Sequence, residues 1–270
     1  VMHPVFLISG WEIPAYTLCA FLAAAAAIAL ALPALRRTGL GAVRSEGLLG
    51  MMCAAFLIGA RLWNAVINPG NFLGTLKWYS LRLTGLSFYG GVLSAGLVLV
   101  TALRVWRRPV WEGLDAMTVP GGVAFCIARI GCFLNGCCAG KATSCPFGVV
   151  FPSKLAAQQA LSEWLPFFPA SHAVHPTQLY ELFGAAVGLP LAVWLSRCLC
   201  LRPGAVFLLY GAWFSAVRLA VLPLRTLTYP DVVRNIFYPL LYLSLTILGI
   251  GMAIWRGRAT VQNTDPGADC

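Results

Sequence analysis

Seven apolar stretches dominate this chain, and each is long enough to cross a lipid bilayer as a helix. A spanning helix needs about 20 mainly apolar residues. Only 10% of the 270 residues are charged, against roughly 25% in a soluble domain. The sequence therefore predicts an all-α polytopic membrane protein that forms a single membrane domain over residues 1–270. The expected spans are residues 13–35, 47–67, 88–105, 114–134, 177–201, 204–224 and 236–255.

Basic residues at the ends of these spans predict their orientation. The arginines that fall on one side are Arg36, Arg37, Arg44, Arg104, Arg107, Arg108, Arg197, Arg202, Arg256 and Arg258. Basic loops stay in the cytoplasm, so the N-terminus is expected outside, the C-terminus inside, and residues 135–176 form a periplasmic excursion. Residues 71–82 form an amphipathic stretch that suits the membrane interface.

The net charge of +10 does not point to nucleic acid. Basic loops that set topology and touch anionic lipid account for it, and no nucleic-acid partner is expected. We see no internal repeat of the kind that builds many transporters from inverted halves.

One arginine, Arg129, lies near the end of the fourth expected span. A charged side chain inside a bilayer costs about 3 kcal/mol or more and normally has an anionic partner. The acidic candidates are Glu12, Asp115 and Glu181. One interpretation is a structural ion pair. The other is a phosphate clamp for a phospholipid headgroup, because the guanidinium fork suits phosphate. Arg61 and Arg218 also lie within expected spans.

Two further segments carry polar groups at the outer ends of spans. Gly85 to Gly91 precedes and enters the third span, where paired glycines can let backbone N–H groups face an anion. His175 to Glu181 places an imidazole, an amide, a phenol and a carboxylate at the start of the fifth span. The alternative for this second segment is simply a polar helix start at the membrane surface.

Four cysteines cluster at the outer end of the fourth span: Cys132, Cys137, Cys138 and Cys145. A disulfide is one interpretation, because the outer side is oxidising, and Cys145 is then the better partner for Cys137 or Cys138. A zinc site is the second, although this spacing is unusual for zinc. A reactive thiol that relays a transferred group is the third.

Taken in their order along the chain, these segments resemble motifs of the prolipoprotein diacylglyceryl transferase family, and the resemblance covers nearly the whole chain. Ala128 to Gly140 resembles its signature G-R-x-G-N-F-x-N-G-x-x-x-G, His175 to Glu181 resembles HPSQLYE, and Gly85 to Gly91 resembles G-x-S-F-H-G-G. The shorter matches are His3-Pro4-Val5, Tyr16, Gly59-Ala60-Arg61 and Leu209-Tyr210-Gly211.

The resemblance implies a seven-helix protein of the bacterial inner membrane with its N-terminus outside. Such an enzyme moves diacylglyceryl from phosphatidylglycerol onto the cysteine thiol of a lipoprotein precursor and releases glycerol phosphate. We expect no cofactor and no metal ion. The expected catalytic residues are Arg129, His175, Glu181 and Tyr89. The expected headgroup-binding residues are Arg61, Gly90, Gly91, Asn135, Gly140, Arg218, Tyr16, Gln178 and Tyr180.

The chain departs from the family pattern at five positions. Tyr89 replaces a histidine, Cys132 an asparagine, Cys137 an acid, Phe214 an arginine, and Arg218 a second acid. We predict that Arg218 substitutes for the missing arginine one helical turn further along. The alternative function for such a divergent member is membrane thiol-redox chemistry or lipid binding through the cysteine cluster.

Overall fold

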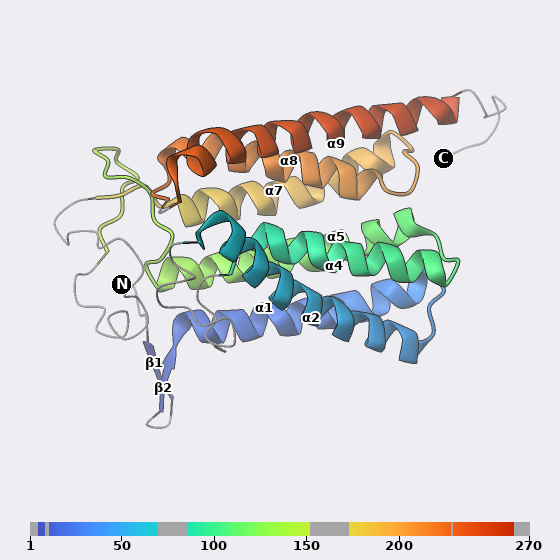
Figure 1. The fold of residues 1–270 in the computed structure, drawn as a ribbon, viewed down its shortest axis with the longest axis horizontal. Helices are drawn as coiled ribbons and strands as arrows, with labels where there is room; N and C mark the ends of the chain where they lie inside the picture. The colour runs from blue at the N-terminus through green and yellow to red at the C-terminus, as the bar shows by residue number, and fades with distance from the viewer. Residues whose placement is uncertain (1–4, 9–10, 70–85, 152–172, 228, 262–270) are drawn as a thin grey trace.

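The computed structural model describes residues 5–8, 11–69, 86–151, 173–227 and 229–261 (Figure 1). Seven of its helices are long and apolar enough to cross a membrane, which confirms the predicted fold class. The helices are α1 (Ala15–Arg37), α2 (Ala42–Ile67), α4 (Phe88–Val105), α5 (Val110–Leu134), α7 (Thr177–Cys198), α8 (Ala205–Val221) and α9 (Tyr238–Val261).

Four smaller elements were not predicted. Strands β1 (Val5–Ile8) and β2 (Trp11–Pro14) form an antiparallel hairpin before α1. A 3₁₀ helix, η1 (Leu222–Leu224), extends α8, and a π-helix, η2 (Val233–Phe237), leads into α9. The amphipathic stretch expected at 71–82 lies outside the described residues.

Several helix ends differ from the expected ranges for local reasons. The fifth expected span ends early, at Cys198, where Cys200 takes a left-handed φ of 46°. The sixth leaves α-helical geometry after Val221, because Pro223 has no N–H to donate. Helix α5 begins at Val110, directly after Pro109.

The helices form an elongated bundle in which α7, α8 and α9 lie along one side and α1 and α2 along the other, with α4 and α5 between (Figure 1). Close packing of α2 on α4 depends on glycine. A Cβ on Gly90 would lie 2.4 Å from the carbonyl oxygen of Gly59. Helix α1 crosses α5 at Gly131, where a Cβ would lie 2.6 Å from Cβ of Cys19.

Asp115, one of the expected partners of Arg129, has a different role. Its carboxylate accepts hydrogen bonds from the backbone N–H of Gly204 at 2.6 Å and of Phe207 at 2.8 Å. It therefore caps the first turn of α8, where unpaired N–H groups need acceptors. These two hydrogen bonds connect α5 to the start of α8.

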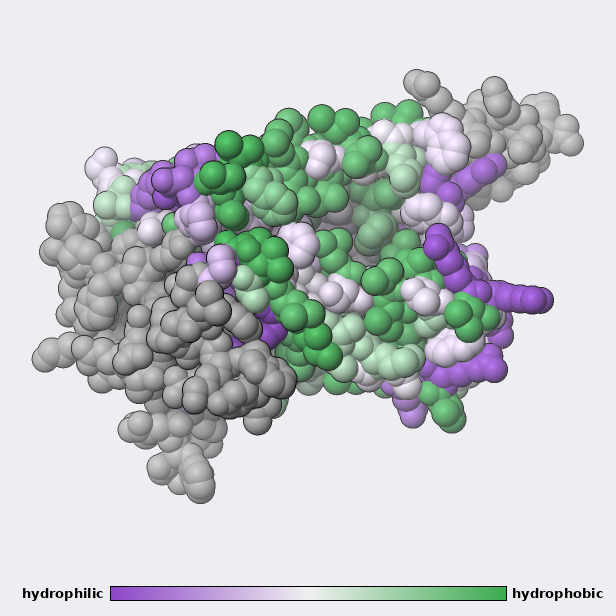
Figure 2. Space-filling view, in the orientation of Figure 1, coloured by the Kyte–Doolittle hydropathy of each residue, from purple (hydrophilic) through white to green (hydrophobic). Residues whose placement is uncertain are grey.

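The surface matches a membrane environment (Figure 2). Hydrophobic side chains cover the visible face along the bundle, and hydrophilic ones gather toward its ends. Large apolar side chains such as Phe21, Leu97, Phe183 and Ile247 are more than half exposed. An apolar surface of this kind belongs in lipid, so the chain is a multi-pass membrane protein.

Candidate functional site: a buried arginine cluster around Glu181

The centre of the site is the carboxylate of Glu181, in the second turn of α7. Glu181 is 2% exposed and forms ion pairs with three arginines. Its Oε2 lies 2.8 Å from Nη2 of Arg129, and its Oε1 lies 2.7 Å from Nη1 of Arg218 and 3.1 Å from Nη1 of Arg225. Three guanidinium groups and one carboxylate leave two surplus positive charges in a buried place.

Aromatic rings support two of these arginines. The guanidinium of Arg129 lies 4.8 Å from the ring centre of Phe125 in the same helix. The guanidinium of Arg218 lies 5.6 Å from the ring centre of Tyr89 and 5.7 Å from that of Tyr242, and its Nη2 donates to the Tyr242 hydroxyl at 3.3 Å. The negative faces of the rings stabilise the cations and fix their positions.

Arg225 was missed by the sequence analysis, because it lies just beyond the expected span that ends at residue 224. It follows η1 and pairs with Gly140 in a short antiparallel bridge. Beside this bridge, the N–H of Lys141 donates to the carbonyl of Leu224 at 2.8 Å. The loop after α5 therefore holds Arg225 against Glu181.

Gly140 occupies a position where no side chain fits. A Cβ there would lie 2.6 Å from the carbonyl oxygen of Leu224, 2.7 Å from Cβ of His175 and 2.8 Å from Cγ2 of Thr177. Its N–H donates to the carbonyl of His175 at 2.8 Å. The glycine thus allows three segments to meet next to the arginine cluster.

Three of the four clustered cysteines come together. The Sγ atoms of Cys132, Cys137 and Cys138 all lie within 4.8 Å of one another. The turn that folds them together has left-handed φ values of 68° at Gly136 and 63° at Cys138. All three are free thiols. We call these three residues the thiol triad.

The thiol triad is tied to the start of α7, the helix that carries Glu181. The Gln178 side chain donates to the carbonyl of Cys137 at 2.6 Å, and the Thr177 hydroxyl donates to the carbonyl of Cys138 at 2.8 Å. Cys145 lies outside the triad and is also a free thiol. A disulfide between Cys145 and Cys137 or Cys138 was one of the alternatives from the sequence, and the structure does not contain it.

The charges around the triad favour a thiolate on Cys138. Hydrogen bonds from Cys132 and Cys137, together with the positive charges of Arg129 and Arg225, hold the pKa of the Cys138 thiol well below its usual range. Hydrogen bonds with Cys132 and Cys138, together with burial, raise the pKa of the Cys137 thiol. The negative charge of the triad is therefore concentrated on Cys138.

The other predicted residues surround the cluster or lie apart from it. His175 and Tyr180 form their own pair, with Nδ1 of His175 3.3 Å from the tyrosine hydroxyl. Tyr16 lies where α1 crosses α5, since its Cα is 3.6 Å from the Cβ position of Gly131. Asn135 caps the end of α5. Their chemical roles stay predictions.

The remaining predicted residues lie in the α2–α4 pair. Gly90 and Gly91 pack against α2, where a Cβ on Gly91 would lie 2.6 Å from the Phe56 ring. The N–H of Gly91 donates to the carbonyl of Ser87 at 3.2 Å. The close approach of α2 to Gly90 and Gly91 gives both glycines a packing role. Arg61 is half-buried on α2. Binding of a headgroup by these residues stays a prediction.

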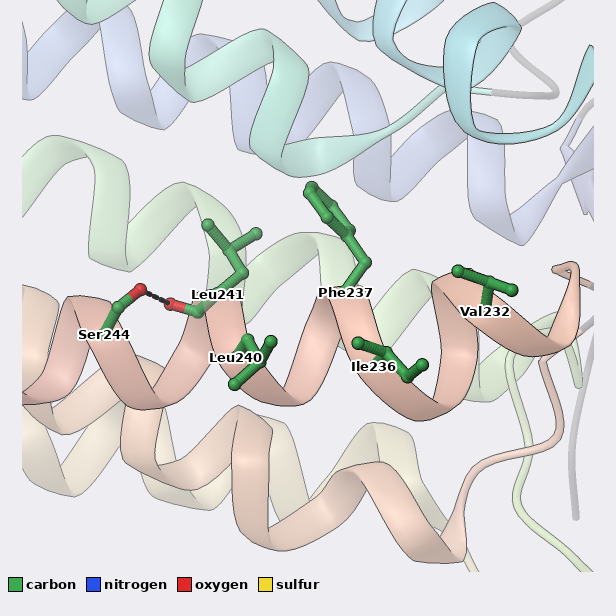
Figure 3. A pocket seen from close by; sticks show the side chains of 6 residues that line it. All are labelled: Val232, Ile236, Phe237, Leu240, Leu241 and Ser244. Carbon is green, nitrogen blue, oxygen red and sulfur yellow. Dashed lines mark hydrogen bonds between the residues drawn. The ribbon is translucent and has the colours of Figure 1, made fainter.

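A groove of about 490 Å³ lies along η2 and the start of α9, and none of its lining residues belongs to the arginine cluster (Figure 3). Its lining is almost wholly apolar: Val232, Ile236, Phe237, Leu240, Leu241 and Ser244. The Ser244 hydroxyl donates to the Leu241 carbonyl within the helix at 3.0 Å. This surface suits contact with lipid chains and offers no group for proton transfer.

The fold and the site together define a polytopic membrane protein with a buried, positively charged centre suited to an anion. The model of the family described as "Prolipoprotein diacylglyceryl transferase" matches residues 4–257. The chain belongs to this family.

Curated relatives support the family assignment. The chain is 31% identical over 181 residues to phosphatidylglycerol–prolipoprotein diacylglyceryl transferase of Thermus thermophilus, covering 60% of this chain and 61% of that protein. It is 30% identical over 226 residues to the enzyme of the same name from Solidesulfovibrio magneticus, covering 81% and 79%. It is 27% identical to the enzyme of the same name from Clostridium tetani, and this match covers 63% of this chain and 63% of that protein.

Proposed function

We propose that this protein transfers a diacylglyceryl group from a phosphatidylglycerol-like phospholipid to the thiol of a lipoprotein precursor. The names of the relatives supply the reaction and both substrate classes. The observation that carries the proposal is the surplus of two positive charges around Glu181. In the reaction the acceptor thiol gives up its proton to solvent and its sulfur forms a C–S bond at the glyceryl carbon. The C–O bond to phosphate breaks with its electron pair left on the phosphate oxygen, and anionic glycerol phosphate leaves.

The arginine cluster fits the charge that develops in this step. As the C–O bond breaks, negative charge builds on the phosphate oxygens, and preorganised cations stabilise it most strongly in a buried site. Arg129 and Arg218 are held by rings and by Glu181, so little reorganisation is needed when phosphate binds. Planar guanidinium groups can bind phosphate oxygens in pairs.

The position of Arg218 explains how the chain can lack the arginine that the family pattern has at Phe214. The Phe214 ring packs against Phe125, with ring centres 4.8 Å apart, and against Phe88 at 5.7 Å. The positive charge instead comes from Arg218, one turn further along α8 and paired with Glu181. This arrangement supports the prediction that Arg218 takes over that role.

We also propose the bacterial inner membrane as the location, with the arginine cluster toward the outer side. The support is the distribution of basic residues. Arg36, Arg104 and Arg197 lie in the last turns of α1, α4 and α7, at the opposite end of the bundle from the hairpin (Figure 1). Basic residues gather on the cytoplasmic side.

Arg129→Ala tests the proposal. Purified protein in phosphatidylglycerol-containing micelles is incubated with a lipobox peptide, and the thioether product and released glycerol phosphate are measured by mass spectrometry. We expect the variant to lose product formation while it still binds detergent and migrates as a folded monodisperse species.

The matched control is Arg234→Ala. Arg234 pairs with Asp231 at the protein surface, so this variant removes an arginine without touching the cluster and should keep wild-type activity. Full activity in Arg129→Ala, or no thioether product from the wild-type protein with any phosphatidylglycerol, contradicts the proposed function.

A further inference from the structure

We propose that the thiol triad, Cys132, Cys137 and Cys138, is a binding site for Cu(I). Their Sγ atoms lie within 4.8 Å of one another. Metal–thiolate bonds near 2.3 Å put the sulfur atoms of one ion roughly 4 Å apart, so a small contraction of the triad is enough. This proposal departs from the sequence prediction that no metal binds.

The number and type of ligands favour Cu(I) over other ions. Soft thiolates select Cu(I), zinc and iron–sulfur clusters. Structural zinc almost always takes four protein ligands, whereas the group found among the described residues supplies three. Cu(I) has a filled d shell and accepts three sulfur ligands in a plane.

The charge of the surroundings points the same way. Three thiolates and one Cu(I) ion carry a total charge of −2. The cluster around Glu181 carries a surplus of +2, and Arg129 lies three residues before Cys132 on the same face of α5, where i and i+3 side chains are neighbours. The nearby positive charge therefore offsets part of the negative charge of a copper–thiolate centre in a buried place, where unmatched charge is costly.

The protein holds the triad in place before any ion arrives. The carbonyls of Cys137 and Cys138 are fixed by Gln178 and Thr177, and the Cys137 thiol lies 3.6 Å from the carbonyl of Cys132. Cys132 and Cys137 are buried, while Cys138 is partly exposed. An ion can thus enter at Cys138 and finish in a closed site.

Binding involves no change of oxidation state. Cu(I) displaces every proton still bound to the three sulfur atoms, these protons pass to solvent, and three Cu–S bonds form. The covalent relay considered from the sequence is less suitable, because a triad thiol that took the diacylglyceryl group would hold it as a thioether. A thioether sulfur is a poor leaving group, so the group would not move on to a second acceptor.

The test uses the full chain in detergent under anaerobic conditions, without phospholipid. Cu(I) is added as its acetonitrile complex and titrated against the chromogenic chelator bathocuproine disulfonate. We expect the wild-type protein to retain one Cu(I) per chain, and X-ray absorption of the bound ion to show three sulfur neighbours. The variant with Cys132→Ser, Cys137→Ser and Cys138→Ser should retain none, and Cys145→Ser should behave as wild type.

A second measurement on the wild-type protein keeps the test decisive if the triple variant misfolds. Bound Cu(I) should protect Cys138, the partly exposed thiol of the triad, from iodoacetamide, while Cys145 reacts to the same extent with or without the ion. Equal alkylation of Cys138 in both states overturns the proposal, as does stronger retention of Zn(II) than of Cu(I). Because no lipid is present, these results are independent of whether the protein is a transferase.

Discussion

Replacing Glu181 with glutamine should destabilise the protein strongly. The change keeps the size of the side chain but removes the negative charge that Arg129, Arg218 and Arg225 share. The surplus charge in the buried cluster then rises from +2 to +3. Removing one partner of a buried ion pair costs about 3–5 kcal/mol of unfolding free energy, because the other charge is left uncompensated.

The chain offers a control in an exposed ion pair of similar length. Glu46 pairs with Arg36 at 2.9 Å, close to the 2.8 Å of Glu181 with Arg129, but the Glu46 side chain is 58% exposed. Exposed pairs of this kind contribute roughly 0–1 kcal/mol. Glu46→Gln should therefore have little effect, and the difference between the two variants measures the combined effect of burial and of three arginine partners instead of one.

Thermal unfolding in detergent, followed by tryptophan fluorescence, measures both variants. At roughly 2–4 °C per kcal/mol for a chain near this size, Glu181→Gln should melt about 6–20 °C below wild type. Added phosphate should raise its melting temperature more than that of wild type, because the cluster now has one more unmatched positive charge. Equal melting temperatures for Glu181→Gln and Glu46→Gln would show that the reasoning about buried charge is wrong.

Three further predictions address the surroundings of the site. Gly140→Ala should destabilise the protein by about 1–3 kcal/mol, the range for overpacking, and lower the proposed transferase activity by displacing Arg225. Gly96→Ala, where the added Cβ meets no atom within 4 Å, should do neither, and equal melting temperatures of the two variants would refute this. Cys138 should react with iodoacetamide faster than free cysteine at pH 7 and below, because its lowered pKa keeps the thiolate populated as the pH falls. Peptide mass spectrometry over pH 6–9 measures the alkylation rate. A rate that rises only near the pKa of free cysteine, about 8.5, argues against the prediction. Asp115→Ala should destabilise the protein by about 0.5–2 kcal/mol, because it removes the cap of α8. Urea or thermal unfolding measures this loss of stability. Asp231→Ala, which changes an 81% exposed side chain, should not show it.

The membrane spans could be predicted because each is a continuous apolar run, and the length of such a run is set by the bilayer. The hairpin before α1 could not, because its two strands have only four residues each, too few to form a long periodic pattern. Helix ends near Pro223 and Cys200 also depended on local backbone geometry.

The site was predicted in its parts rather than in its arrangement. Arg129, Arg218 and Glu181 could be selected because charged residues are rare in membrane spans. Their convergence depends on how α5, α7 and α8 pack together, and no local pattern encodes that packing. Arg225 was overlooked because it follows a 3₁₀ turn outside the spans, where an arginine is ordinary.

The cysteine cluster, too, could be predicted from the sequence in its members but not in its arrangement. Closeness in the sequence indicated that four thiols gather at the end of α5. The separation of Cys145 from the thiol triad depends on the left-handed turn at Gly136 and Cys138, which the residue types do not reveal. Seeing which three thiols share a centre therefore required the folded loop.

The three arginines come from segments with very different freedom to change. Arg129 and Arg218 are buried residues of the membrane-spanning helices α5 and α8. Arg225 stands on a connecting loop and is joined to the centre through its bridge to Gly140. Insertions or exchanges in that loop can therefore retune the reach of one cation, and with it the size of anion accommodated, while the helical frame stays as it is.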